Sequence, residues 1–447
     1  MTEQEHSEAS ETSDTGAYVK HLSQVNETKQ VTATEDICNE LGAIIVKAGS
    51  PISEKMTQRI IKFKLVKPIE SSVAIENDVD GTMLYDDIQK IISKNKSLVH
   101  IHDTLQLEGI LKHLCNHYQS YPVLRQKMTV LSIQMSRSYT QSLLSACIAT
   151  LIANELDLPQ QEMEAVFLAA ITHDIGMLHI DEAILNQKES LTPAEWRQIK
   201  AHPIIAQNIL DAIPCLAKET GVAVLEHHER NDGTGYPLGK FSRELSLAGN
   251  IVALSDSSVA VLERLRKEGR NLRDLIPILQ INQYAHSYPV YEAFILALRK
   301  IKLDEGGIVK KEDMPSYVDR LLSNITHLST WLEAVDQCLT PIGFTHRNRK
   351  IHAIQTVLMN IAVTVRGSGI LDENYVGFLR SIQSKNDRAA FREIEDVSLM
   401  LNEVDFHLRR LERMVQEYLE LDENRSGSIY KALQEGHKNI KAQKCKT

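Results

Sequence analysis

Apolar residues recur at steps of three and four through the central part of the chain, from about residue 127 to residue 300. This spacing predicts helices that each bury one face. The segment Asp157-Leu158-Pro159 ends one such helix, and a second predicted helix runs over residues 161–172 directly into His173. The predicted buried face of the first helix is formed by Leu143, Leu144, Cys147, Ile148, Leu151 and Ile152.

The N-terminal part has a different pattern. Residues 1–25 are polar and acidic, which predicts a disordered tail. Residues 30–33 and 43–46 are short strand candidates joined through a turn-like stretch at 39–42. Ser53 followed by Glu54 is typical of a helix start. We therefore predict a small α+β regulatory module with a helical linker over residues 26–125.

The C-terminal part contains one regular apolar seam with alternating steps of three and four. It predicts either packing inside a helical bundle or contact with a second chain or partner protein. Met400 and Met414 widen the stripe, which is consistent with a bundle. The seam consists of Ile394, Val397, Leu401, Val404, Leu408, Leu411, Val415 and Tyr418. The expected fold class is mainly α: the N-terminal module, a central helical bundle over 126–300 and a C-terminal helical bundle over 301–447.

Composition narrows the function classes. The chain has 447 residues, 43% hydrophobic and 24% charged, with a net charge of −9, which argues against a DNA-binding role. The longest near-apolar run, residues 143–153, is shorter than the about 20 residues of a membrane span. Six scattered cysteines without a CxxC pattern, and no secretory signal, predict reduced thiols and a cytoplasmic location.

Histidines and acids gather in the central region. The motif residues are separated by similar intervals, from 174 to 202, from 202 to 227 and from 228 to 256, which suits one ligand cluster per helix converging on a shared site. Imidazole nitrogens and carboxylate oxygens together bind Fe, Mn or Zn. A single interior histidine is more often only hydrogen-bonded, and we assign that role to His179. The joint pattern is formed by His173, Asp174, His202, His227, His228 and Asp256.

A second histidine pair, His113 and His117, has the i, i+4 spacing that can hold a metal on a helix. No acid or third histidine stands near this pair at a suitable spacing in the sequence, so we interpret both as surface residues.

The double histidine is followed by a glycine-rich segment, residues 226–239. Glycine lets a backbone approach a neighbour closely, and proline stiffens a turn. Together with the metal-ligand pattern, this segment resembles the HD-GYP domains over residues 137–265. The motifs that carry the resemblance are His173-Asp174, His202-Pro203 and His227-His228-Glu229 with Asp232-Gly233-Thr234-Gly235-Tyr236-Pro237. HD-GYP domains are bacterial metal-dependent phosphodiesterases that hydrolyse cyclic di-GMP, within the wider HD phosphohydrolase group.

The resemblance implies an HD-type helical bundle that binds two divalent metal ions, most often Fe or Mn. Asp174 would bridge the metals, and a metal-bridging hydroxide would attack phosphorus, so Asp174 and His173 are the expected catalytic residues. His202, His227 and His228 would complete one metal site, and His173, Asp256 and position 141 the other. The expected residues for binding cyclic di-GMP are Asp232, Gly233, Gly235, Tyr236, Pro237, Arg264 and Arg266. Arg264 and Arg266 fit a solvated basic helix face equally well.

The chain also departs from the family pattern. Gln141 stands where the family has a ligand histidine and offers only a weaker amide oxygen, and Met177 replaces a lysine. The stretch after Asp256, residues 257–263, differs as well. Two hypotheses therefore stay open: a working cyclic di-GMP phosphodiesterase, or a degenerate domain that binds metal, with or without cyclic di-GMP, and signals without turnover. An HD hydrolase acting on another nucleotide is a third reading, which the intact GYP segment disfavours.

Overall fold

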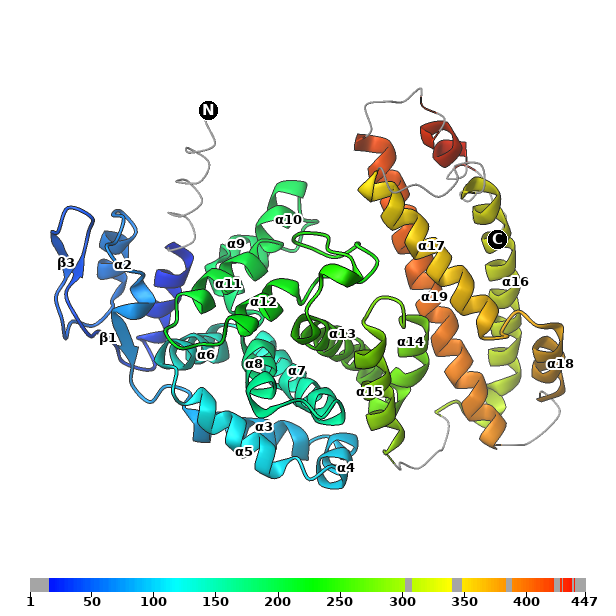
Figure 1. Cartoon of the computed structure of the whole chain (residues 1–447), viewed down its shortest axis with the longest axis horizontal. Coiled ribbons are helices and arrows are strands. Elements are labelled where there is room, and N and C mark those ends of the chain that lie inside the picture. Colours follow the sequence, from blue (N-terminus) through cyan, green and yellow to red (C-terminus); the bar gives the residue numbers. More distant parts are fainter. Residues whose placement is uncertain are drawn as a thin grey trace.

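Helices form most of the molecule, and short strands occur in its N-terminal part (Figure 1). The computed structural model describes residues 16–301, 308–339, 348–382 and 388–421, together with 427, 429–435 and 438. The prediction of a mainly α protein is confirmed. Among the described helices, none combines the length and the apolar character that a bilayer crossing requires.

The N-terminal part holds two small antiparallel sheets, β1 with β4 and β2 with β3. The predicted strands at 30–33 and 43–46 form β1 and β3, but each pairs with a strand the sequence did not reveal. Gly42 adopts a φ of 77°, and the Asn39 side chain accepts the backbone N–H of Ala43 at 2.8 Å, so the turn folds β3 back onto β2. The elements are β1 (Val31–Ala33), β2 (Ile37–Cys38), β3 (Ile44–Val46), α2 (Glu54–Ile60) and β4 (Val73–Ile75).

The prediction of a disordered tail is wrong for residues 16–25, which form a helix. Its apolar side chains follow helical spacing, and four of them are fully buried: Tyr18, Val19, Leu22 and Val25. Burial of this apolar face stabilises the segment, although its polar neighbours hide the pattern. Residues 1–15 lie outside the described residues.

Residues 81–299 form the helices of the central part of the chain. They are α3 (Gly81–Ser93), α4 (Lys96–Thr104), α5 (Glu108–Tyr118), α6 (Pro122–Gln134), α7 (Ser136–Glu155), α8 (Gln160–Thr172), α9 (Glu182–Leu185), α10 (Pro193–Ile199), α11 (His202–Asp211), α12 (Lys218–Glu226), α13 (Leu247–Lys267), α14 (Leu275–Ile281) and α15 (Tyr288–Arg299). A 3-10 helix, η2 (Ile175–His179), follows α8, and another, η1 (Ile69–Ser71), precedes β4.

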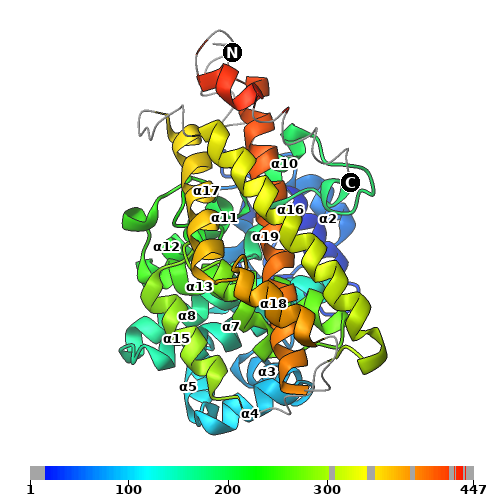
Figure 2. The ribbon, with the colours of Figure 1, turned by 90° about the vertical axis from the view of Figure 1, so that its right-hand side faces the viewer.

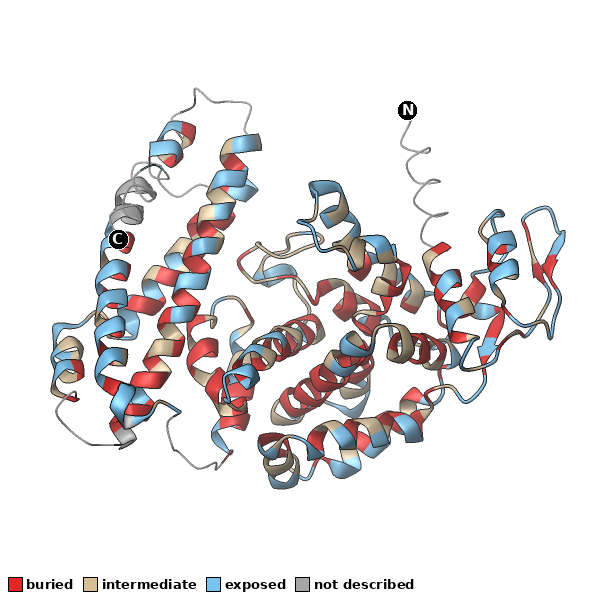
Figure 3. Ribbon diagram, turned by 180° about the vertical axis from the view of Figure 1, so that it is seen from behind, coloured by how far each residue is buried: buried red, intermediate tan, exposed pale blue. Residues whose placement is uncertain are grey.

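Helix α7 lies at the centre of this part and differs from its prediction. We expected one buried face, but every residue from Ser142 to Ala153 is buried (Figure 3). The helix packs against α3, α6, α8, α13 and α15, so its small polar residues are enclosed as well. One continuous hydrophobic core extends from Tyr18 to Ile301, and the N-terminal module shares it.

The C-terminal helices build a second hydrophobic core. They are α16 (Met314–Leu339), α17 (Arg349–Gly367), α18 (Glu373–Ile382) and α19 (Arg388–Leu421), and α16, α17 and α19 run side by side (Figure 2). The apolar seam of α19 is buried within the chain at every position except the half-buried Val415. Of the two arrangements predicted for this seam, packing inside a bundle fits its burial, because α16 and α17 lie against α19 in the same core.

A buried charge cluster connects the N-terminal module to the helices that follow. Lys127 of α6 is fully buried, and its Nζ lies 2.8 Å from Glu70 Oε1 and 2.8 Å from His179 Nε2. The same ammonium lies 3.1 Å from the centroid of the Tyr18 ring. Four segments thus meet at one cation: the helix at residues 16–25, η1, α6 and η2. His179 has the structural role that we assigned to it, here as a hydrogen-bond partner of Lys127.

Replacing Glu70 with glutamine should destabilise the fold strongly, because it leaves the Lys127 ammonium buried without a countercharge. Loss of one partner of a buried ion pair typically costs about 3–5 kcal/mol of unfolding free energy. The matched control is Glu35→Gln, which breaks an exposed pair with Lys67 and should have a much smaller effect. Urea denaturation of both variants measures the difference, and equal losses would contradict this role for Lys127.

The contribution of Glu70 should also depend on pH. Burial alone would raise the pKa of Glu70, but the charges of Lys127 and His179 lower it to about 2 from 4.5. A carboxyl with a lowered folded-state pKa stabilises the fold above the unfolded value and loses this contribution as pH falls. The stability gap between the native chain and Glu70→Gln should therefore be full above pH about 4.5 and shrink toward pH about 2. A gap that stays constant over this range would refute the assignment.

Candidate metal centre

The predicted ligand residues stand at the ends of short helices and on one long helix. His173 directly follows α8, Asp174 precedes η2, and His202 begins α11. His227 and His228 follow α12. Asp256 lies within α13. The structure brings all six residues together, although they come from segments up to 83 positions apart (173 to 256).

Three of the histidines use the same local hydrogen bond. In His173, His202 and His227, Nδ1 lies 2.8, 2.7 and 2.6 Å from the backbone carbonyl oxygen of the residue three positions earlier. These carbonyls lie at or near helix ends, where they need a donor from outside the helix. A ring that donates from Nδ1 keeps the lone pair of Nε2 free, which is the orientation a metal-binding histidine requires.

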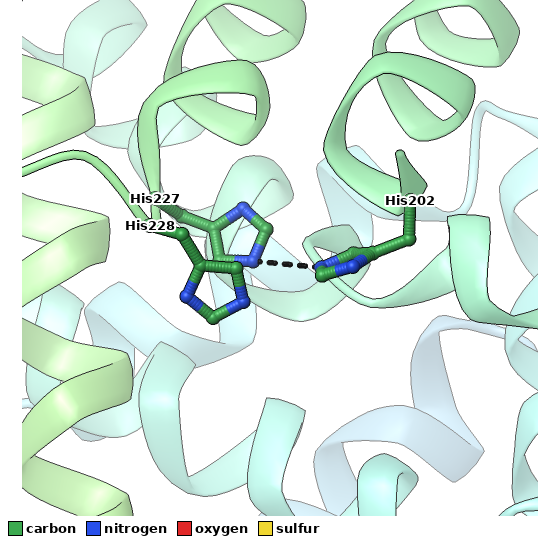
Figure 4. Close-up of side chains that lie close together, drawn as sticks. All are labelled: His202, His227 and His228. Atoms are coloured by element: carbon green, nitrogen blue, oxygen red, sulfur yellow. Dashed lines mark hydrogen bonds between the residues drawn. The ribbon is translucent and has the colours of Figure 1, made fainter. Parts of the chain in front are cut away.

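The free nitrogens point at one another. His202 Nε2 lies 3.2 Å from His227 Nε2, and the His228 ring stands beside them (Figure 4). With both Nδ1 atoms donating to carbonyls, neither Nε2 carries a proton, so two lone pairs face each other. Burial lowers the pKa of His227 well below its ordinary value, and the neighbouring histidines lower it further. A divalent cation satisfies these nitrogens where a proton would be costly, so the residues fit a metal.

Two carboxylates complete the cluster. Asp174 lies between two histidines, with Oδ1 3.5 Å from His202 Nε2 and Oδ2 3.6 Å from His173 Nε2. Asp256 Oδ1 lies 3.5 Å from His173 Nε2, and its Oδ2 lies 3.8 Å from His228 Nδ1. Within the described residues, ligand atoms less than 4.8 Å apart form two groups, His202 with His227 and His228, and His173 with Asp174 and His227. His227 belongs to both groups.

The electrostatics of the cluster favour positive charge. Burial would lower the pKa of His173, but Asp174 and Asp256 raise it to about 9. Burial would raise the pKa of Asp256, but its hydrogen bond with His173 and the charge of that ring lower it to about 2. The carboxylate of Asp256 therefore holds a cation beside it, whether a proton on His173 or a metal ion.

The GYP loop, residues 231–241, is held next to the histidine pair by two acidic side chains of the residues that flank this pair. The carboxylate of Glu229 is buried and accepts the backbone N–H groups of Leu238, Gly239 and Lys240 at 2.7, 3.0 and 3.0 Å. The carboxylate of Glu226 accepts a hydrogen bond from the Lys240 ammonium at 2.6 Å. No role was predicted for Glu226 from the sequence, although it directly precedes the histidine pair in the pattern Glu-His-His-Glu. These two acids fix the loop that follows the histidine pair.

The loop residues differ in what they do. Tyr236 places its ring 4.5 Å from the His228 ring, and Pro237 follows it, half-buried. Gly235 is packed so tightly that an added Cβ would lie 2.3 Å from the Glu229 Cα, so only glycine fits. Gly233 adopts a φ of 73°. Asp232 is buried and accepts the backbone N–H of Thr234 at 3.0 Å, so its carboxylate shapes the turn.

Among the described residues, four other predicted site positions form no hydrogen bond or ion pair with the metal cluster. Arg264 pairs with Glu403 of α19 at 3.3 Å, and Arg266 is exposed on α13. Gln141 on α7 and Met177 in η2 are half-buried. Among the described residues, the Gln141 side chain has no hydrogen bond to a residue of the cluster. Among the described residues, short distances thus join the six histidines and aspartates, and no hydrogen bond or ion pair joins these four positions to them.

The second histidine pair has an acidic partner that the sequence did not reveal. Glu164 of α8 lies 2.7 Å from His113 Nε2 and 3.7 Å from His117 Nε2. His113 is exposed and His117 is half-buried, in line with their interpretation as surface residues, and their acidic partner lies on another helix, where spacing in the sequence does not reveal it. Within the described residues, these three side chains do not gather their ligand atoms as closely as the two groups above.

Comparisons with known proteins agree with this arrangement. A protein-family model described as an HD domain matches residues 122–288. The chain is 31% identical over 186 residues to cyclic di-GMP phosphodiesterase PA4108 of Pseudomonas aeruginosa, covering 40% of this chain and 45% of that protein. It is 35% identical over 165 residues to a cyclic di-GMP phosphodiesterase of Thermotoga maritima, covering 36% and 45%.

A third relative is the 3'3'-cGAMP-specific phosphodiesterase 3 of Vibrio cholerae, 37% identical over 114 residues, covering 25% of this chain and 24% of that protein. In each case the match spans less than half of the relative's length. The matched segment contains the histidine cluster and the GYP loop described above. An HD domain model thus matches residues 122–288, and the relatives and the HD and GYP motifs in this segment support its resemblance to the HD-GYP family.

Proposed function

We propose that this protein is a metal-dependent phosphodiesterase that hydrolyses cyclic di-GMP. The observation that carries the proposal is the pair of ligand groups that share His227, with Asp174 between His173 and His202. These residues would hold two divalent metal ions, Fe or Mn, and Asp174 would be within reach of both groups. Asp256 would complete the group of His173.

The chain's own residues prepare the site for this reaction. The carbonyl-anchored histidines already point their Nε2 atoms toward the cluster, which lowers the cost of binding metal. When bound, two divalent cations supply an activated water at neutral pH and stabilise the charge that develops on a phosphoryl group. The GYP loop forms one wall of the site, because Tyr236 lies against the ring of His228.

The substrate assignment depends on this loop and on the relatives. Relatives are named for cyclic di-GMP and for 3'3'-cGAMP, both of which are cyclic dinucleotides with two phosphodiester bonds. Cyclic di-GMP is the substrate we propose. Tyr236 is the loop side chain best placed to contact it, and Asp232, Gly233, Gly235 and Pro237 give the loop its shape.

Loss of His227 should remove both metals, because it belongs to both ligand groups. We expect His227→Ala to lose most of its bound Fe or Mn and all measurable hydrolysis, while the control His113→Ala keeps both. Elemental analysis of the purified full-length chain, together with chromatography of the products from cyclic di-GMP and 3'3'-cGAMP, measures these effects. Metal-loaded native protein that leaves cyclic di-GMP intact would contradict the proposal, and preference for 3'3'-cGAMP would change the substrate.

The alternative is a degenerate domain that binds metal and cyclic di-GMP without turnover. It is favoured by Gln141 and Met177, because neither side chain supplies a good metal ligand or a positive charge. Loss of one electrostatic contact to a transition state typically costs about 10²–10³ in rate.

The double variant Gln141→His, Met177→Lys separates the two readings. If the native site is active but impaired, kcat should rise by up to about 10²-fold in the variant, because a ligand and a charge are restored. Steady-state kinetics under manganese, with Asp174→Asn as the inactive control, measures the change. A native chain without turnover whose variant gains turnover would establish the degenerate reading.

A further inference from the structure

The C-terminal helices reach back to the GYP loop. Arg349 at the start of α17 donates to the backbone oxygen of Gly239 at 2.6 Å and pairs with Glu244 at 3.3 Å. The His352 ring of the same helix lies 5.0 Å from the Phe241 ring. The loop therefore lies between the histidine cluster and the C-terminal helices, and both sides contact it.

One face of α19 is directed toward the HD domain along most of its length. Its residues recur at steps of three and four, separately from the apolar seam. Arg392 pairs with Asp274 at 2.6 Å, and Glu403 accepts Asn282 at 2.9 Å. This second stripe consists of Arg392, Glu395, Leu399, Glu403, His407 and Arg410. The contacts fix the register of the helix, and the last residue of the stripe is placed at the GYP loop.

Arg410 contacts the GYP loop at Thr234, two residues before Tyr236. Its Nη2 donates to the backbone oxygen of Thr234 at 3.3 Å and to the hydroxyl of the same residue. Thr234 in turn hydrogen-bonds to Asp232. Two residues after Thr234, the Tyr236 ring lies against His228. A guanidinium from the C-terminal helices therefore stands beside the wall of the metal centre.

A second guanidinium lies close by. Arg230 donates from Nη1 to the backbone oxygen of Glu229 at 2.7 Å and to that of His227 at 3.4 Å. The backbone oxygen of Arg230 accepts the N–H of Gly233 at 2.9 Å, directly before the Thr234 that Arg410 contacts, so both arginines flank the same turn. Within the part of the chain that is described, neither arginine forms an ion pair with a carboxylate; Asp232 reaches Arg410 only through the Thr234 hydroxyl. Two guanidinium groups beside one turn, neither held by a carboxylate at ion-pair distance among the described residues, suit the binding of an anion.

We propose that Arg230 and Arg410 together bind a phosphate group of the cyclic dinucleotide, so that the C-terminal bundle contributes part of the substrate site. This inference rests on the proposed function for the nature of the anion. Guanidinium groups suit the task because their planar fork donates two parallel hydrogen bonds to phosphate oxygens. In the hydrogen bonds of the described residues Arg410 uses only Nη2, so Nε and Nη1 are available for an anion there.

The test compares Arg410→Ala with a control on the adjacent residue. Arg409 is 69% exposed and pairs with Asp405 on its own helix, so Arg409→Ala changes the charge equally without touching the loop. The full-length, metal-loaded proteins are titrated with a phosphorothioate analogue of cyclic di-GMP by calorimetry. Arg410→Ala should weaken binding and raise KM by about 10- to 100-fold, the worth of one charged hydrogen bond. Arg409→Ala should match the native protein.

Unfolding midpoints and metal content are measured on each variant. If Arg410→Ala does not fold, Arg410→Lys is tested instead. Lysine keeps the positive charge but lacks the planar guanidinium that donates two parallel hydrogen bonds. Several-fold weaker binding of the analogue by Arg410→Lys supports the proposal. Unchanged binding in the folded variant overturns it. A loss of kcat alone, with KM and binding unchanged, also overturns it, because that pattern indicates a role in loop geometry.

The same experiment separates this inference from the proposed function. Native protein that binds the analogue through Arg410 but hydrolyses no cyclic dinucleotide would refute the proposed function and leave the phosphate site intact. Native protein that hydrolyses cyclic di-GMP with the same KM after Arg410→Ala would refute the phosphate site alone. A native chain that neither binds nor hydrolyses would overturn both.

Discussion

The hydrogen bond from a histidine Nδ1 to a carbonyl three residues earlier is the interaction on which the candidate metal centre depends. It occurs at His173, His202 and His227, each with a carbonyl in the last turn of a helix. One contact thus satisfies the backbone and turns Nε2 toward the centre of the cluster. Since the ring orientations come from short local segments, packing of the helices alone is enough to assemble the ligands.

The sequence predicts the parts of this fold that depend on local pattern. The helices ending at Asp157 and at His173, the mainly α class and the gathering of six ligand residues follow from periodicity and motif spacing. The histidine cluster was predictable because its residue types are rare and concentrated. The extent of burial of α7 was not, because its small polar residues at Ser142 and Ser145 look solvent-facing until helices on every side enclose them.

What the sequence could not predict are contacts between distant segments. The helix at residues 16–25 is stable only because Tyr18 and its apolar neighbours pack into a core made elsewhere. Glu164 meets His113 across two helices, and β1 pairs with β4, about 40 positions further along. In α19 a strong apolar seam masks the weaker polar stripe, so that the reach of Arg410 to the loop becomes visible only in the structure.

The polar stripe of α19 also makes helix length a matter of function. Successive residues of an α-helix point about 100° apart around its axis. Removing a single residue between Glu403 and Arg410 would leave the contacts of Arg392 and Glu403 in place. It would rotate the Arg410 guanidinium about the helix axis, away from Thr234. Point substitutions along this stretch are local changes, whereas an insertion or deletion alters the register of everything beyond it. The number of residues in α19 between its contacts near α14 and its contact with the GYP loop therefore determines where Arg410 lies.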